Sequence, residues 1–176
     1  MLLPETKPLD FEAYLGWVYT SQLTPGDTED GFDRGMMIVR LYFLGDFLDD
    51  TKFCNTVMDT FHFNDAWDPF YLMFESMNLA WEETTAGSPL RDFILELLVY
   101  NIATRPNTES YLKVMHQSDI SREIVLDLLL HMESKHGLSK LIQTTAALRL
   151  PDMKVRCLFH RHDNENPKCS KSKLSD

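Results

Sequence analysis

Four residues near the C-terminal end of the chain have the types and spacing of a metal site: Cys157, His160, His162 and Cys169. Zinc prefers thiolate and imidazole ligands, and four of them complete a closed tetrahedral site. The Cys-x-x-Cys and His-x₃₋₅-His spacings that are typical of zinc knuckles are absent from this stretch. The pattern predicts a zinc site here, and the alternative is an unstructured basic tail with two incidental cysteines.

Basic side chains surround this cluster, which suggests a zinc-stabilised tail that binds nucleic acid as an alternative function. They are Lys154, Arg156, Arg161, Lys168, Lys171 and Lys173. Four acidic residues in the same stretch offset part of this positive charge. Phe159 is the one aromatic residue of the stretch that could stack on a base. The whole chain carries a formal net charge of −10, which argues against a nucleic acid as the main partner.

Motifs for catalysis are missing from the sequence. The seven glycines form neither a phosphate-binding loop nor the Gly-x-Ser-x-Gly turn of a hydrolase. Adjacent carboxylates such as Asp49-Asp50 and Glu82-Glu83 diverge on a helix, so we interpret them as helix-end residues rather than as an acid–base pair. The sequence therefore predicts a protein that is not an enzyme. An all-α enzyme with a polar pocket between its helices is the alternative.

Two further histidines, His131 and His136, are five residues apart. On a helix this spacing turns their side chains about 140° away from each other, so they cannot face one metal ion. We interpret both as surface residues.

The 176 residues are 44% hydrophobic, which predicts a packed body rather than a disordered chain. Residues 1–90 contain 16 acidic and 4 basic residues, and residues 91–176 contain 11 and 13. Three cysteines are too few for a disulfide framework. The sequence shows no signal peptide, and it has no apolar run of about 18 residues, the length of a membrane-spanning helix. We expect an intracellular protein, cytoplasmic or nuclear, that has no membrane partner.

Apolar residues recur with the helical period along most of the chain, and no segment shows the alternation of a strand. The predicted fold class is all-α. The predicted helices span about residues 10–20, 36–48, 53–61, 70–81, 90–104, 109–116 and 119–135, and Gly137 ends the last of them. From residue 151 onward the pattern gives way to a polar tail.

Two of these helices carry informative apolar faces. In the first, Phe11, Tyr14, Leu15 and Val18 share one face, as in an amphipathic helix. The helix at 36–48 is apolar nearly all round, which predicts burial on several sides. A third series combines methionines and aromatic residues at helical spacing and predicts core packing, with a ligand groove as the alternative. It consists of Phe70, Met73, Phe74, Met77 and Trp81.

Several of these segments resemble the middle of a BTB (POZ) domain. The stretch at residues 3–20 ends in WVYT, similar to the Trp/Ile-hydrophobic-Tyr-Thr end of a BTB helix that follows a core strand and an acidic turn. The sequences LYFLGDFL at 41–48 and FCNTVMD at 53–59 are similar to the next two helices of that family. GSPLR at 87–91 and CLFHRH at 157–162 resemble segments of filamentous-fungal BTB proteins.

The resemblance implies a non-catalytic interaction protein, because BTB domains bind one another, cullin-type ubiquitin-ligase scaffolds or transcriptional partners. It divides the chain into the C-terminal portion of a BTB-like domain at 1–65, a helical extension at 66–150 and a basic Cys/His tail at 151–176. A scaffold-type role would use residues 10–65. The strands and two helices that begin a BTB domain have no counterpart here, so we expect the first helix to lack part of its packing surface.

Overall fold

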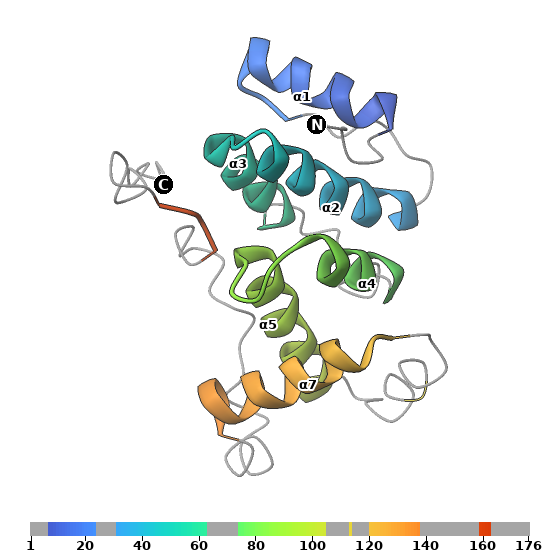
Figure 1. Cartoon of the computed structure of the whole chain (residues 1–176), viewed down its shortest axis with the longest axis vertical. Coiled ribbons are helices and arrows are strands. Elements are labelled where there is room, and N and C mark those ends of the chain that lie inside the picture. Colours follow the sequence, from blue (N-terminus) through green and yellow to red (C-terminus); the bar gives the residue numbers. More distant parts are fainter. Residues whose placement is uncertain are drawn as a thin grey trace.

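The computed structural model describes residues 7–23, 31–62, 74–104, 113, 120–137 and 159–162. Within these ranges it contains six α-helices, one π-helical turn and no strand, so the all-α prediction is confirmed. The helices are α1 (Pro8–Thr20), α2 (Gly31–Phe47), α3 (Thr51–His62), α4 (Phe74–Glu83), α5 (Pro89–Thr104) and α7 (Arg122–His131), and the π-turn is Met132–His136. Figure 1 shows α1 at one end of the molecule, α2 and α3 beneath it, α4 and α5 next, and α7 at the other end.

The helix boundaries agree with the predicted ranges in most places. α2 begins at Gly31, five residues earlier than predicted. α5 begins at Pro89, one residue before the predicted start, and proline is favoured at the first position of a helix. Gly137 follows the last turn with a φ of 63°, which suits a residue without a Cβ. The predicted helix at 109–116 lies outside the described residues except for Lys113, and so do residues 70–73.

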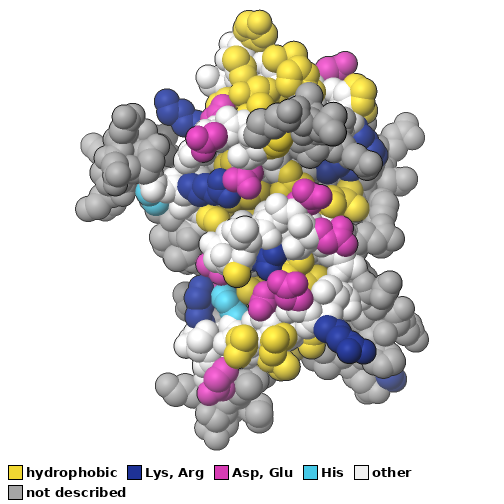
Figure 2. Space-filling model, viewed as in Figure 1, with side chains coloured by type: hydrophobic (Ala, Val, Ile, Leu, Met, Phe, Trp, Pro, Cys, Tyr) yellow, Lys and Arg dark blue, Asp and Glu magenta, His cyan; other side chains and the backbone are white. Residues whose placement is uncertain are grey.

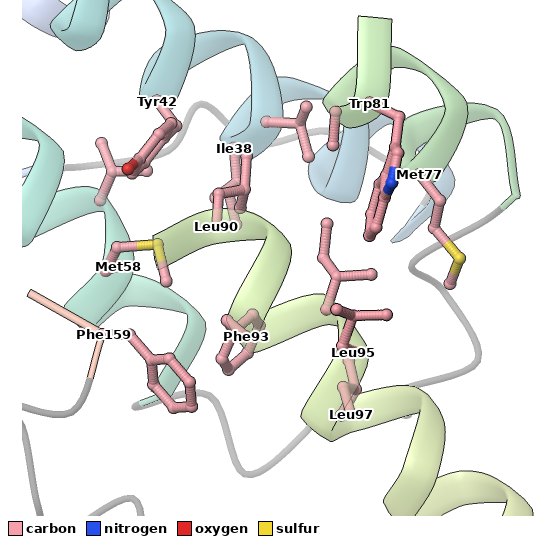
Figure 3. Packing of buried hydrophobic residues seen from close by; sticks show 14 of the residues in the cluster. Ile38, Tyr42, Met58, Met77, Trp81, Leu90, Phe93, Leu95, Leu97 and Phe159 are labelled. Carbon is pink, nitrogen blue, oxygen red and sulfur yellow. The ribbon is translucent and has the colours of Figure 1, made fainter. Parts of the chain in front are cut away.

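The core is centred on α2, as the all-round apolar pattern of this helix predicted. Ile38, Val39, Leu41, Tyr42 and Leu44 are completely buried. Buried residues of α3, α4, α5 and α7 join α2 in a continuous hydrophobic cluster (Figure 3). Within the methionine–aromatic series, Met77 and Trp81 belong to this cluster, which confirms core packing for these two. No side-chain placement is described for the other three members.

The close contact between α2 and α3 depends on a glycine and on a helix cap. A Cβ at Gly45 would lie 2.7 Å from Cys54 Sγ and 2.9 Å from a ring carbon of Phe53, which is closer than packed atoms approach. Just before α3, Asp50 Oδ1 accepts a 3.0 Å hydrogen bond from the backbone N–H of Phe53. This carboxylate therefore caps a helix start, in agreement with the interpretation of the Asp49-Asp50 pair.

A buried arginine joins α4, α5 and α7. Arg91 donates from Nε to Thr84 Oγ1 (3.0 Å) and from Nη2 to the Trp81 carbonyl (2.6 Å), and its Nη1 lies 3.1 Å from Glu123 Oε1. The guanidinium also lies over the Trp81 ring, 5.0 Å from its centroid. Trp81 Nε1 in turn donates to Asp127 Oδ2 at 2.8 Å. These groups hold three helices by directional contacts that an apolar core alone does not provide.

The prediction that His131 is a surface residue is wrong, because its side chain is only 7% exposed. His131 follows Ile124 and Leu128 at helical spacing on the buried face of α7. Its Nε2 lies 3.0 Å from Glu96 Oε1 on α5, and Lys135 approaches the same oxygen at 3.6 Å. The side chain of His136 lies outside the described part of the chain.

Candidate functional site

Polar contacts attach α1 to the rest of the molecule. Arg40 Nε lies 2.8 Å from Asp10 Oδ2, Arg40 Nη2 lies 3.3 Å from Asp10 Oδ1, and the Asp10 side chain is 1% exposed. The backbone N–H of Lys7 also donates to Asp10 Oδ2, at 3.2 Å. Asp10 therefore closes the first turn of α1 and binds α2 with the same carboxylate.

Aromatic side chains complete the inner surface of α1. The rings of Tyr14 and Trp17 lie 4.8 and 5.0 Å from the ring of Phe53 on α3. Tyr14 Oη donates to Asp50 Oδ2 at 3.2 Å, and burial together with this carboxylate raises the pKa of Tyr14. The inner surface of α1 thus consists of Asp10, Tyr14 and Trp17, which are spaced to share one side of a helix.

The side of α1 next to this inner surface is apolar as well, and it is exposed. Three residues of the predicted amphipathic stripe, Phe11, Leu15 and Val18, are 40%, 39% and 49% exposed, and the neighbouring Tyr19 is 86% exposed. We call these four residues the α1 outer face. Figure 2 shows hydrophobic side chains gathered at the end of the molecule where α1 lies. The predicted stripe is therefore real, but the structure turns most of it toward solvent. An apolar surface that extends this far round a helix is typical of a helix that packs on more than one neighbour.

A second candidate surface involves the segment at residues 159–162. Phe159 is 3% exposed and its ring meets that of Phe93 on α5 edge to face, with the centroids 5.3 Å apart (Figure 3). A residue from the predicted polar tail therefore belongs to the hydrophobic core. Burial of one aromatic side chain in this way fixes the position of the polar residues that follow it.

Asn55 of α3 binds the backbone of Arg161 with both ends of its amide. Asn55 Nδ2 donates to the Arg161 carbonyl at 3.0 Å, and Asn55 Oδ1 accepts from the Arg161 N–H at 2.9 Å. One side chain thus satisfies the N–H and the C=O of a single residue, as a neighbouring strand would in a sheet.

The Arg161 side chain lies between α2 residues. Its Nη1 binds Asp46 Oδ1, and its guanidinium lies over the Tyr42 ring, 5.4 Å from the centroid. Burial by itself would lower the pKa of Arg161, but the hydrogen bond that Arg161 donates to Asp46 and the surrounding charges outweigh it and raise the pKa. This cation, which the nucleic-acid hypothesis includes among its phosphate contacts, is thus bound to a carboxylate of the chain itself.

Two members of the predicted zinc site, His160 and His162, are described, and their ring centroids are 6.3 Å apart. His160 Nε2 lies 3.0 Å from Asp59 Oδ1 on α3. Cys157 and Cys169 lie outside the described residues, and no group of three or more potential ligands forms within the part of the chain that is described. Zinc binding stays a prediction. It would use Nδ1 of His160, with Asp59 as the carboxylate that orients a ligating imidazole.

The one cysteine within the described ranges, Cys54, is buried and unpaired. Its Sγ lies 3.6 Å from the Tyr42 carbonyl, and burial raises the pKa of the thiol to about 12. A thiol with this pKa is protonated at neutral pH and is a poor nucleophile.

Comparisons of the chain with protein-family models, with curated proteins and with solved structures found no match. Among the helices that the structure describes, none combines the length and the apolar character that crossing a bilayer requires.

Sequence reasoning missed the residues that seat the 159–162 segment: Asp46, Asn55 and Asp59. Their helical positions gave no sign of a distant partner, because each contact spans more than 100 residues of sequence. One signal did exist. The first 90 residues are strongly acidic and the tail is basic, so a tail that carries an aromatic residue between basic ones has an acidic surface within reach.

Proposed function

We propose that the chain is a non-catalytic protein–protein interaction module of the BTB/POZ type, with the α1 outer face as its contact surface. One observation carries the proposal: the apolar surface of α1 extends beyond the side that packs on α2 and α3, and the residues of the α1 outer face are 39–86% exposed. Aromatic and aliphatic side chains grouped on an exposed helix are typical anchors of a protein interface.

The chemistry of the surface specifies the kind of partner. Phe11, Leu15 and Val18 follow the i, i+4, i+7 spacing with which a helix fills an apolar groove. The first 90 residues carry a net charge of −12, so a partner with basic residues around its apolar groove would be attracted to this half of the chain.

The BTB resemblance suggests a cullin-type scaffold as this partner. In the cullin-binding members of that family, the middle helices of the domain and the helices that follow it form the contact. The elements of this chain that correspond are α1, α2 and α3, which lie within residues 10–65 apart from the first two residues of α1.

The polar clusters support a non-catalytic role. Asp50 caps α3, Arg91 joins three helices, and Glu96 pairs with His131 inside the fold. The Cys54 thiol is buried with a pKa of about 12. Each of these groups thus has a structural task that accounts for its position.

A pull-down with an immobilised cullin N-terminal domain at micromolar concentration tests the proposal. The wild-type chain is expected to be retained. Leu15→Glu, which places a charge in the middle of the α1 outer face, should abolish retention. Leu126→Glu is the matched control, because it makes the same change at an exposed leucine of α7, at the other end of the molecule (Figure 1). Absence of wild-type retention, or equal loss in both variants, would contradict the proposal.

A further inference from the structure

We propose that the surface formed by α2, α3 and Phe93 of α5 is a peptide-recognition groove for a short segment of the sequence aromatic–histidine–arginine. Residues 159–161 are the copy of this segment that the chain itself carries. The groove is defined here by five residues: Tyr42, Asp46, Asn55, Asp59 and Phe93. It differs from the α1 outer face in position and chemistry, so either proposal can fail without the other.

Each residue of the segment contacts its own side chain or pair of side chains in the groove. Phe159 packs its ring edge against Phe93, and His160 Nε2 lies 3.0 Å from the Asp59 carboxylate. Arg161 binds Asp46 and lies over Tyr42. The groove thus offers separate contacts for an aromatic side chain, an imidazole and a guanidinium, in the order of residues 159, 160 and 161.

The backbone contact is the feature that identifies peptide recognition. The Asn55 amide binds both the N–H and the carbonyl of Arg161, at 2.9 and 3.0 Å, and this pair is independent of the side chain at that position. Main-chain hydrogen bonds supply affinity and alternating side-chain pockets supply specificity when an extended peptide is bound. Here a main-chain pair and three side-chain contacts occur within three consecutive residues.

The groove is also accessible from solvent. The Asp46 and Asp59 side chains are 38% and 30% exposed, and Arg161 is 31% exposed. The helices that form the groove also have buried contacts of their own, because Val39, Phe53 and Val57 lie with Phe159 in one core cluster. Phe159 and the His160 side chain, which are 3% and 5% exposed, anchor the segment, and the Arg161–Asp46 pair is the partly exposed end at which a second peptide of the same sequence can begin to displace it.

The test uses the full chain with its own segment weakened by Phe159→Ala and Arg161→Ala, which we call the open variant. The probe is a fluorescein-labelled synthetic peptide of residues 158–164, which lacks both tail cysteines, so its binding does not depend on a Cys-ligated metal. Fluorescence anisotropy should show saturable binding to the open variant and at least about tenfold weaker binding to the wild type, whose groove is already filled. Adding Asn55→Ala to the open variant should weaken binding about tenfold, as expected for the loss of a buried hydrogen-bonded pair.

A charge exchange tests specificity. Asp46→Arg in the open variant should reverse its preference, so that it binds a peptide with glutamate at the arginine position better than the original peptide. Failure of a folded open variant to bind the peptide, or binding that Asn55→Ala leaves unchanged, would overturn the proposal.

Far-UV circular dichroism shows whether the open variant keeps the helicity of the wild type. If it does not, the same peptide is added unlabelled at millimolar concentration to the wild-type chain, where it competes with the tethered segment. The backbone ¹⁵N resonances of residues 159–161, which the added peptide displaces from the groove, should then change, and unchanged resonances at saturating peptide would overturn the proposal.

Discussion

The Asp10 carboxylate and the Arg40 guanidinium form a two-point ion pair between α1 and α2, with contacts of 2.8 and 3.3 Å. The pair lies beneath a helix whose other side faces solvent. Because apolar burial on one side only would leave the rotation of α1 weakly defined, a directional contact of this kind determines which side points inward. The exposed α1 outer face is thus a consequence of where Asp10 lies in the sequence.

The first prediction concerns this pair. Arg40→Ala should lower the free energy of unfolding by about 3–5 kcal/mol, because it leaves the buried Asp10 carboxylate without its counter-charge. Urea denaturation followed by circular dichroism measures the change. Lys52→Ala, at an exposed lysine, is the control and should change stability by less than about 0.5 kcal/mol. If both variants change the free energy of unfolding by the same small amount, the buried Asp10 carboxylate does not need Arg40 as its counter-charge.

The second prediction concerns the Cys54 thiol, whose pKa burial raises to about 12 from its ordinary value of 9.0. The folded chain therefore keeps the proton that the unfolded chain loses above pH 9. The stabilisation from this thiol is complete below pH 9 and is lost as the pH rises toward 12. Ellman's reagent at pH 8, with peptide mapping by mass spectrometry, should modify Cys54 only in denaturant. Rapid modification of Cys54 in the folded chain would contradict the assignment.

The third prediction tests whether Phe159 is part of the core. Phe159→Ala should cost about 3–5 kcal/mol of unfolding free energy, because it removes a buried ring and leaves a cavity beside Phe93. Phe11→Ala is the matched control at an exposed phenylalanine and should cost less than about 1 kcal/mol. If the two variants unfold at the same denaturant concentration, the ring of Phe159 does not contribute to the core.

The fourth prediction concerns zinc. Elemental analysis of the chain purified under reducing conditions should find one zinc per chain, and Cys157→Ser should remove it. Asp59→Asn should weaken zinc binding without abolishing it, because Asp59 would orient His160 rather than bind the metal. A chain free of zinc after dialysis against stoichiometric zinc would end this hypothesis.

Helical periodicity was sufficient to predict the fold class and most of the helices. Local patterns are reliable here because α2 and α5 are long and strongly apolar, and because Ser88-Pro89 and Gly137 mark boundaries by their own backbone chemistry. The side of a helix that faces the core was harder to predict. In α1, Asp10, Tyr14 and Trp17 form the inner side, while the other three residues of the predicted stripe, Phe11, Leu15 and Val18, are exposed.

The tail contacts could not be derived from local patterns. His160 and Arg161 bind residues that lie more than 100 positions earlier in the chain. The ring of Phe159 packs against Phe93 of α5. His131 illustrates the same difficulty, because its burial depends on the presence of Glu96 on a neighbouring helix. Pairings of this kind depend on tertiary packing, which a pattern along one segment does not record.

Calorimetric titration of the cullin N-terminal domain with the chain at several temperatures tests the central claim most directly. If the α1 outer face is the contact surface, binding should show a negative heat-capacity change, which is the mark of apolar burial, and Leu15→Glu should remove the binding heat. Leu126→Glu should leave the binding heat and the heat-capacity change as they are in the wild type. No binding by the wild-type chain, or binding that Leu15→Glu leaves intact, would contradict the account.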